Sequence, residues 1–137
     1  MTISRFYNVH IVDPSQSIDS IGYLDIVDGK ISNLEPGIPG NHDIVDNLTD
    51  CNGAVLAPGL VDMRVQSADP GAEHLESLPT LLAAAAKGGI TALACLPNTR
   101  PIIDEASAID SLCLRASRIG GPRLSAYGAA TKSLLGT

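Results

Sequence analysis

The sequence has few aromatic residues: no tryptophan, one phenylalanine and three tyrosines among 137 residues. This scarcity argues against a surface on which bases or sugars stack. Basic residues are also scarce, because nine lysines and arginines face fifteen aspartates and glutamates, for a formal net charge of −6. Nucleic acids and anionic membranes bind basic surfaces, so neither is expected as a partner.

Long apolar runs and cysteine pairs are missing as well. No segment approaches the roughly 20 apolar residues of a membrane span, and the first residues lack the apolar core of a signal peptide. The three cysteines form no CxxC pair, which indicates buried thiols in a reducing compartment rather than a disulfide framework. We therefore expect a cytoplasmic protein without a membrane partner. These thiols are Cys51, Cys95 and Cys113.

The composition is otherwise that of a globular protein, with 45% hydrophobic residues that are mostly aliphatic. Residues 1–56 alternate apolar and polar residues over short segments separated by turn residues, which predicts a small antiparallel sheet. Asp28-Gly29 has the composition of a hairpin turn. Such a sheet has one apolar face and must pack on something else. Its strands are expected at residues 7–12, 21–27, 30–34 and 43–46.

From residue 54 the pattern becomes that of a parallel α/β fold. Residues 55–65 are nearly all apolar, which predicts a strand buried on both faces. Two further strands are expected at residues 90–96 and 123–130, each preceded by a helix, so that right-handed crossovers connect parallel strands.

The two helices have recognisable ends. The first is expected to begin after Ser77 as N-cap, with Pro79 in its first turn, and to end at Gly88-Gly89. The second is expected to have Asp104 as its N-cap and to end near Arg118. The inward positions should be Leu81, Leu82, Ala85 and Ala86 in the first helix and Ile109, Leu112, Cys113 and Ala116 in the second.

Four motifs along the second part of the chain resemble the dihydroorotase family, a group of cyclic amidohydrolases with a metal-bearing barrel. The similarity covers most of residues 50–135 in the family's order. The motifs are Pro58-Gly59-Leu60-Val61-Asp62-Met63, the turn Asp69-Pro70-Gly71-x-Glu73-His74, the alanine-rich segment 83–91, and Pro97-Asn98-Thr99-Arg100-Pro101.

The resemblance implies an architecture. Residues 57–137 would form the first two to three βα units of a TIM-type (β/α) barrel, and residues 1–56 would belong to the small antiparallel β domain, part of a β-sandwich, that flanks it. A complete barrel needs roughly 250 residues. We therefore expect the front part of a longer protein.

The resemblance also implies a reaction, the interconversion of carbamoyl-aspartate and dihydroorotate in pyrimidine biosynthesis at a binuclear zinc centre. The family's two metal-binding histidines on the first barrel strand fall on Arg64 and Gln66. Its substrate-binding arginine falls on Ala68, and its substrate-binding asparagine falls on Asn98, which is present. The remaining metal ligands and the catalytic aspartate of the family would lie beyond Thr137.

These departures matter chemically. Zinc binds neutral imidazole, thiolate or carboxylate, whereas a guanidinium has no available lone pair and an amide oxygen is a poor zinc donor. Without the metal, bound water keeps a pKa near 15.7 rather than about 7. Ala68 cannot replace a bidentate guanidinium. We expect no zinc, no other cofactor and no catalytic residue in this chain.

Several residues keep two interpretations. Asp62 is either the ion-pair partner of Arg64 or a carboxylate that orients a ligand, and Arg64 either forms that pair or replaces the metal's charge at the barrel mouth. Asn98 either binds a ligand or caps its loop. Glu73 and Glu76 should complement a helix N-terminus, and the histidines should be structural or surface residues. The histidines are His10, His42 and His74.

Three functions follow from these observations. The preferred one is a truncated or degenerate dihydroorotase-like protein that is metal-free and inactive by itself, so whether it is an enzyme stays open. The second is a non-catalytic scaffold that binds aspartate carbamoyltransferase or associates with itself. The third is an amidohydrolase that is active only as a longer chain, with ligands from later strands.

Overall fold

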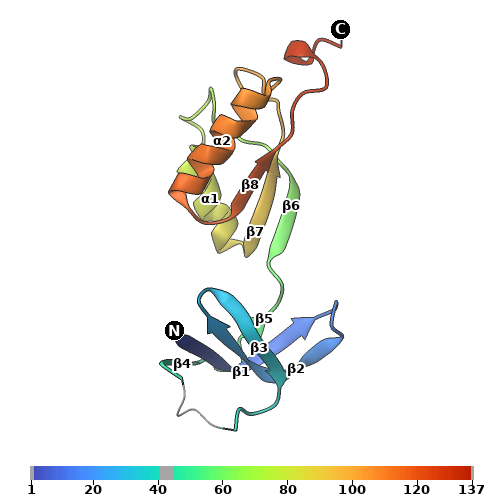
Figure 1. Cartoon of the computed structure of the whole chain (residues 1–137). Helices are drawn as coiled ribbons and strands as arrows, with labels where there is room; N and C mark the ends of the chain where they lie inside the picture. The colour runs from blue at the N-terminus through green and yellow to red at the C-terminus, as the bar shows by residue number, and fades with distance from the viewer. Residues whose placement is uncertain (1, 41–44, 137) are drawn as a thin grey trace. The chain divides into compact units, whose positions relative to one another are not determined.

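The computed structural model describes residues 2–40 and 45–136. Clustering of residues in space divides the chain into two units, Met1–Pro58 and Gly59–Thr137 (Figure 1). The first unit is a sheet, and the second is a sheet with helices on one face. Residues 43 and 44 of the expected strand at 43–46 lie outside the described residues, and so does His42.

The first unit is a five-stranded sheet in the order β3-β2-β1-β4, with β5 also paired to β1. The two hairpin-connected pairs are antiparallel, but β4 and β5 run parallel to β1. The expectation of a purely antiparallel sheet is therefore wrong, because the chain after β3 returns to the start of β1 before pairing. The strands are β1 (Ile3–Asp13), β2 (Ile18–Val27), β3 (Lys30–Pro36), β4 (Asn47–Asp50) and β5 (Val55–Leu56).

Two features hold this sheet in register. Asp28 and Gly29 both have positive φ, 49° and 75°, as a two-residue hairpin turn requires, and they connect β2 to β3 as predicted. Arg5 on β1 is buried against Asp25 on β2, with Nε–Oδ1 and Nη2–Oδ2 distances of 2.6 and 2.8 Å. The Arg5 guanidinium also lies 4.8 Å from the centre of the Tyr23 ring. A bidentate, stacked arginine fixes the pairing of the two longest strands.

The second unit is a parallel sheet in the order β6-β7-β8, with strands Leu60–Val65, Ile90–Cys95 and Arg123–Ala126. Helices α1 (Leu78–Lys87) and α2 (Ala106–Ile119) lie on the same face of it (Figure 1). A short 3-10 helix, η1 (Lys132–Leu134), follows β8. The order strand-helix-strand-helix-strand is the one predicted.

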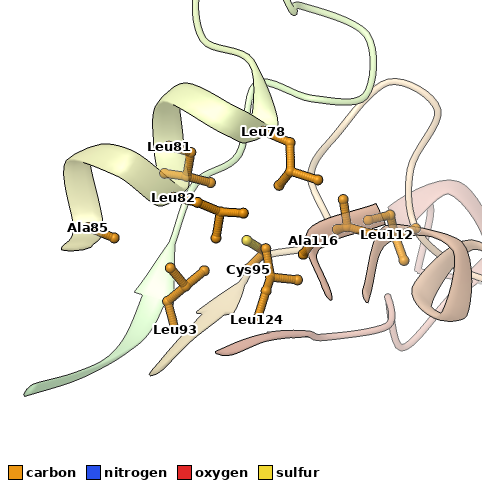
Figure 2. Packing of buried hydrophobic residues seen from close by; sticks show 10 residues of the cluster. Leu78, Leu81, Leu82, Ala85, Leu93, Cys95, Leu112, Ala116 and Leu124 are labelled. Atoms are coloured by element: carbon orange, nitrogen blue, oxygen red, sulfur yellow. The ribbon is translucent and has the colours of Figure 1, made fainter. Parts of the chain in front are cut away.

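The core of this unit lies between the helices and the sheet (Figure 2). It is aliphatic, as the scarcity of aromatic residues requires. Side chains of α1 point toward β7, and those of α2 cover β8. The buried residues are Leu78, Leu81, Leu82, Ala85, Leu93, Cys95, Ile103, Leu112, Ala116 and Leu124.

Helix α1 begins and ends where the sequence indicates. Ser77 is its N-cap, and Ser77 and Thr80 exchange side-chain-to-backbone hydrogen bonds in a capping box. The buried stripe includes Leu78, which was not expected, and leaves Ala86 exposed, which corrects the prediction. The stripe is thus shifted by part of a turn toward the N-terminus.

Helix α2 begins one residue later than expected. Its N-cap position is Glu105, which makes no side-chain capping hydrogen bond. Asp104 instead accepts a hydrogen bond from the backbone N–H of Ser133, at 2.8 Å. The prediction of Asp104 as the cap is wrong, because this carboxylate joins the helix start to η1. Leu112 and Ala116 are buried, while Ile109 and Cys113 are partly buried against the core.

The predicted strand over residues 55–65 is two strands. Residues 57–59, Ala-Pro-Gly, separate β5 of the first unit from β6 of the second. Burial on both faces is also wrong for β6, since Leu60, Val61 and Met63 are 60%, 64% and 67% exposed. The reason is its place at the sheet edge, whereas the helices pack on β7 and β8. None of the helices in residues 2–40 and 45–136 is long and apolar enough to span a membrane.

Candidate functional site

The carboxyl ends of three parallel strands meet at one edge of the second sheet. The backbone N–H of Leu96 donates to the carbonyl of Val65 at 2.8 Å, and that of Tyr127 donates to Cys95 at 2.9 Å. These bonds align the loops that follow β6, β7 and β8. Residues on these loops are therefore candidates for a shared ligand site.

The residues singled out from the sequence lie on this edge, facing solvent. Arg64, Gln66 and Asn98 are exposed, and Ala68 is half-buried. Asp62 does not form the expected ion pair with the Arg64 guanidinium; its Oδ1 accepts the backbone N–H of Arg64 at 2.9 Å. The guanidinium of Arg64 thus extends from the strand end without a recorded partner among the described residues.

A carboxylate that the sequence did not single out organises the loop after β6. Asp69 is 2% exposed, and its Oδ2 accepts hydrogen bonds from Arg115 of α2 at 2.6 Å and from the backbone N–H of Leu78 at 3.2 Å. The ion pair raises the pKa of Arg115. Asp69 therefore joins the loop to the start of α1 and to the middle of α2.

The backbone of the same loop is fixed on both sides of Asp69. The hydroxyl of the buried Ser67 donates to the carbonyl of Asp69 at 2.6 Å and accepts the Asp69 N–H at 3.2 Å. Pro70 accepts a hydrogen bond from the backbone N–H of Arg100 at 3.0 Å. Gly71, at φ 103°, packs so closely on Arg100 that a Cβ would collide with its carbonyl oxygen. The loops after β6 and β7 thus form one rigid platform.

The acidic residues before α1 behave differently from the prediction. The structure has no acidic residue in the first turn of α1, and Glu73 accepts the Gly71 N–H at 2.9 Å instead. This hydrogen bond lowers the pKa of Glu73. Asp69, rather than Glu73, places a negative charge at the N-terminus of α1, where its carboxylate accepts the backbone N–H of Leu78.

The two described histidines belong to different units. The Nε2 of His10 is 2.6 Å from a carboxylate oxygen of Asp19 in an exposed cross-strand pair of the first unit, and His74 is exposed in the second unit. Within residues 2–40 and 45–136, no three His, Cys, Asp or Glu side chains are grouped so that they could hold a metal ion. A surface role for these histidines remains the prediction.

The cysteines are free thiols. Cys95 is completely buried under the helices, and burial raises its pKa to about 11. Cys51 and Cys113 are half-buried. A thiol with so high a pKa is protonated at neutral pH and does not act as a nucleophile or metal ligand.

None of the cavities described in the two units is lined by Arg64, Gln66 or Asn98. One, of about 490 Å³, lies in the first unit between Ile11, Ile31, Leu34 and Leu56. A smaller one, of about 180 Å³, lies beside Pro70, Pro101 and Arg115. The candidate site at Arg64 and Asn98 is therefore an open surface.

Comparison with known proteins gives a consistent result. The model of the dihydro-orotase-like family matches residues 53–130. A dihydroorotase of Anaplasma phagocytophilum is 37% identical over 131 residues, which are 93% of this chain and 29% of that protein. One from Desulforapulum autotrophicum is 39% identical over 133 residues, covering 96% and 31%. The chain spans about 30% of the length of these curated relatives.

Solved structures share the fold. The L-hydantoinase (dihydropyrimidinase) of Arthrobacter aurescens aligns with 96% of this chain and 28% of its own, at a TM-score of 0.76 and 20% identity. A Xaa-Pro dipeptidase with bound methionine in its active site aligns with 93% of this chain and 33% of its own, at a TM-score of 0.64 and 19% identity. The chain therefore shares its mixed α/β fold with these two proteins.

Proposed function

This chain belongs to the dihydro-orotase-like family, and from that premise we propose that it is a dihydroorotase-like protein of pyrimidine biosynthesis without zinc and inactive by itself. The observation that carries the proposal is the end of β6, where Arg64 and Gln66 are exposed at the sheet edge. Family members would need metal-binding histidines at these positions. The chain would thus share the ancestry of the family but not its activity.

The residues at this strand end do not fit the zinc that the family implies. The guanidinium of Arg64 is cationic and offers no lone pair, so it repels a metal ion. The amide oxygen of Gln66 is a weak donor, and Ala68 offers none. The buried carboxylate nearby, Asp69, uses Oδ2 to bind Arg115 and Leu78, and its Oδ1 is buried away from the surface without a partner among the described residues. No reaction step through a metal follows from this arrangement.

We propose that the second unit is the beginning of a TIM-type barrel. Its three parallel strands with two helices on one face support two to three βα units in residues 57–137. The sheet of the first unit, in residues 1–56, would be part of the flanking β-sandwich. The spatial division at Pro58 supports this boundary to within two residues.

Asn98 is the residue most suited to binding a ligand at the proposed site. Its side chain is exposed and makes no recorded hydrogen bond within the part of the chain that the structure describes, so it does not cap its own loop. The loop is held instead by buried Thr99, whose hydroxyl donates to the carbonyl of Pro101 at 2.7 Å. Asn98 is thus presented on a rigid loop and free to bind.

Two alternatives remain as proposals. A scaffold for aspartate carbamoyltransferase requires no metal, and it is compatible with an exposed sheet edge that carries no catalytic residues. An amidohydrolase that works only as a longer chain would take its ligands from residues outside this sequence. The scaffold is tested by mixing the purified chain with aspartate carbamoyltransferase in sedimentation velocity: a new, faster boundary supports it, and unchanged boundaries of both proteins contradict it.

The main proposal is tested by assaying dihydroorotate hydrolysis by the purified chain with excess zinc. We expect a rate no higher than the protein-free control with the same zinc. A rate that rises in proportion to protein, and that falls on substitution of Asn98 by alanine, would contradict inactivity.

A further inference from the structure

The turn between β4 and β5 contains an asparagine followed by a glycine. Residues 51–54 form a β-turn, which is closed by a hydrogen bond from the backbone N–H of Ala54 to the carbonyl of Cys51, at 2.9 Å. Asn52 and Gly53 at its centre have φ values of 51° and 76°, as in a type I′ turn. Both residues are exposed. The turn therefore presents an Asn-Gly pair to water.

An Asn-Gly pair can react with itself. The backbone nitrogen of Gly53 attacks the side-chain carbonyl carbon of Asn52, and the new C–N bond closes a five-membered succinimide. The side-chain amide takes up the proton of the attacking nitrogen and leaves as ammonia. Water then adds to either ring carbonyl, which gives aspartate or isoaspartate, so one water is consumed for each ammonia released. Glycine favours the attack because it has no side chain beside the reacting nitrogen.

Asn52 is the described asparagine best suited to this reaction. The other described asparagines precede larger residues, whose side chains crowd the attacking nitrogen. The side-chain amides of Asn8, Asn33 and Asn47 also donate hydrogen bonds. The side chain of Asn52 makes no recorded hydrogen bond within residues 2–40 and 45–136. The larger residues are Val9, Leu34, Leu48 and Thr99.

The sheet restrains the nitrogen that must attack. The backbone N–H of Gly53 donates to the carbonyl of Asn8 on β1 at 2.7 Å, and that of Asn52 donates to Oδ1 of Asp50 at 2.9 Å. The Gly53 nitrogen can attack only after its own hydrogen bond opens, because that bond holds its proton and fixes its direction. The rate should therefore follow the population of the locally open turn.

We propose that Asn52 is a site of spontaneous deamidation, controlled by the Gly53–Asn8 hydrogen bond, and that its isoaspartate product releases β5 from β1. Isoaspartate lengthens the main chain by one methylene between the two strands. The pairing that follows is short: β5 has two residues, and the His10 N–H donates to the carbonyl of Ala54 at 2.9 Å. The reaction requires no metal and no active site, so it is independent of the function proposed above.

Peptide mapping of aged protein tests the proposal. The 137-residue chain is incubated in mildly alkaline buffer and digested with trypsin, and an unaged sample corrects for modification during digestion. The tryptic peptide 31–64 contains Asn52 and two internal controls, Asn33 and Asn47, each followed by leucine. We expect a gain of about 1 Da at residue 52, mainly as isoaspartate, and at least tenfold less at the controls. An unmodified Asn52, or equal modification of the controls, would overturn the proposal.

The role of the hydrogen bond is tested by the rate. Deamidation should be at least fivefold faster in guanidinium chloride than in the folded chain. Asp50→Ala removes the acceptor of the Asn52 N–H and should raise the folded rate at least threefold, without changing the rate in denaturant. Asp46→Ala is the matched control, because its exposed carboxylate accepts the Ile3 N–H elsewhere on the sheet and both rates should stay unchanged. Equal rates in folded and unfolded protein would contradict control by the turn.

The release of β5 is tested by hydrogen exchange followed by nuclear magnetic resonance. The His10 N–H of the isoaspartate form should exchange at least tenfold faster than that of freshly purified Asn52→Asp. This variant carries the same added charge without the extra methylene, so it is the matched control. Equal exchange of the His10 N–H in the two forms would contradict the release.

Discussion

Individual side chains decide what the end of β6 can do. Arg64 and Gln66 face solvent where a metal site would need imidazoles, and Asp69 behind them is committed to Arg115 and Leu78. A guanidinium and an amide at this strand end are poor zinc ligands, and the Asp69 carboxylate is buried behind them. Hydrogen bonds nevertheless hold the loop in place. We therefore propose that this strand end lost the metal-binding side chains and kept the interactions that fix its loop.

The Asp69–Arg115 pair should contribute to that framework. Arg115→Met leaves a buried carboxylate with only the Leu78 N–H as partner, and we expect a loss of about 2 kcal/mol in unfolding free energy, less than for a fully buried pair because Arg115 is half-exposed. Urea denaturation measures it. Arg118→Met, on the exposed face of the same helix, is the control and should change stability by less than about 0.5 kcal/mol. Equal effects of the two variants would show that the pair has no structural role.

Asp25 should make stability depend on pH in acid. Its hydrogen bonds to Arg5 lower its pKa from the ordinary 3.8 in the folded state. Protonation therefore favours the unfolded chain: the contribution of Asp25 is complete above pH 3.8 and is lost as pH falls toward the lower folded-state value. Urea midpoints measured between pH 5 and pH 2.5 should fall more steeply for the wild type than for Asp25→Asn. Parallel curves would refute this assignment.

Whole elements were predictable where local chemistry determines them. Ser77, Pro79 and Gly88 specify α1, and Asp28-Gly29 specifies the β2–β3 turn, because capping groups and positive φ act within a few residues. The break between β5 and β6 was missed because the alanine, proline and glycine there continue an apolar run. The exposure of β6 depends on which strands the helices cover, and that is a property of the whole sheet.

The candidate site was predictable only in part, for a similar reason. The positions of Arg64, Gln66 and Asn98 follow from motifs that are local in sequence. The Asp69–Arg115 ion pair joins residues 46 positions apart, so no local sequence pattern predicts it. The segment Asp69-Pro70-Gly71 was the available signal, but it was interpreted only as part of a turn.

The start of α1 offers a test at the level of an element. Ser77→Ala removes the hydroxyl that caps the helix, and we expect a loss of about 1 kcal/mol in unfolding free energy. Ser117→Ala in α2 is the control, because its exposed hydroxyl donates only to the carbonyl of Leu114. Chemical denaturation should show little or no loss for Ser117→Ala. If Ser77→Ala were equally harmless, the capping box would not stabilise the helix.

At the scale of the molecule, two sheets each have a face or an edge that the described residues leave open. The chain spans about 30% of the length of its curated relatives, and its second unit is a short parallel sheet with helices on one face. Open edges and uncovered apolar faces favour association or marginal stability.

Thermal unfolding should therefore depend on protein concentration. If copies of the chain associate, mass action raises the midpoint temperature as the concentration increases. Differential scanning calorimetry over a hundredfold range of concentration would show this shift. A sharp, cooperative transition of a monomer, at a midpoint independent of concentration, would contradict both the marginal stability and the self-association that we expect.

The central claim is that this chain keeps the family's fold without the donors for its metal. Its most direct test is the zinc content of the purified 137-residue chain, measured by inductively coupled plasma mass spectrometry after equilibration with zinc and removal of the unbound ion. We expect zinc far below one ion per chain, unchanged in Gln66→Ala. About two zinc ions per chain, lost in that variant, would contradict it.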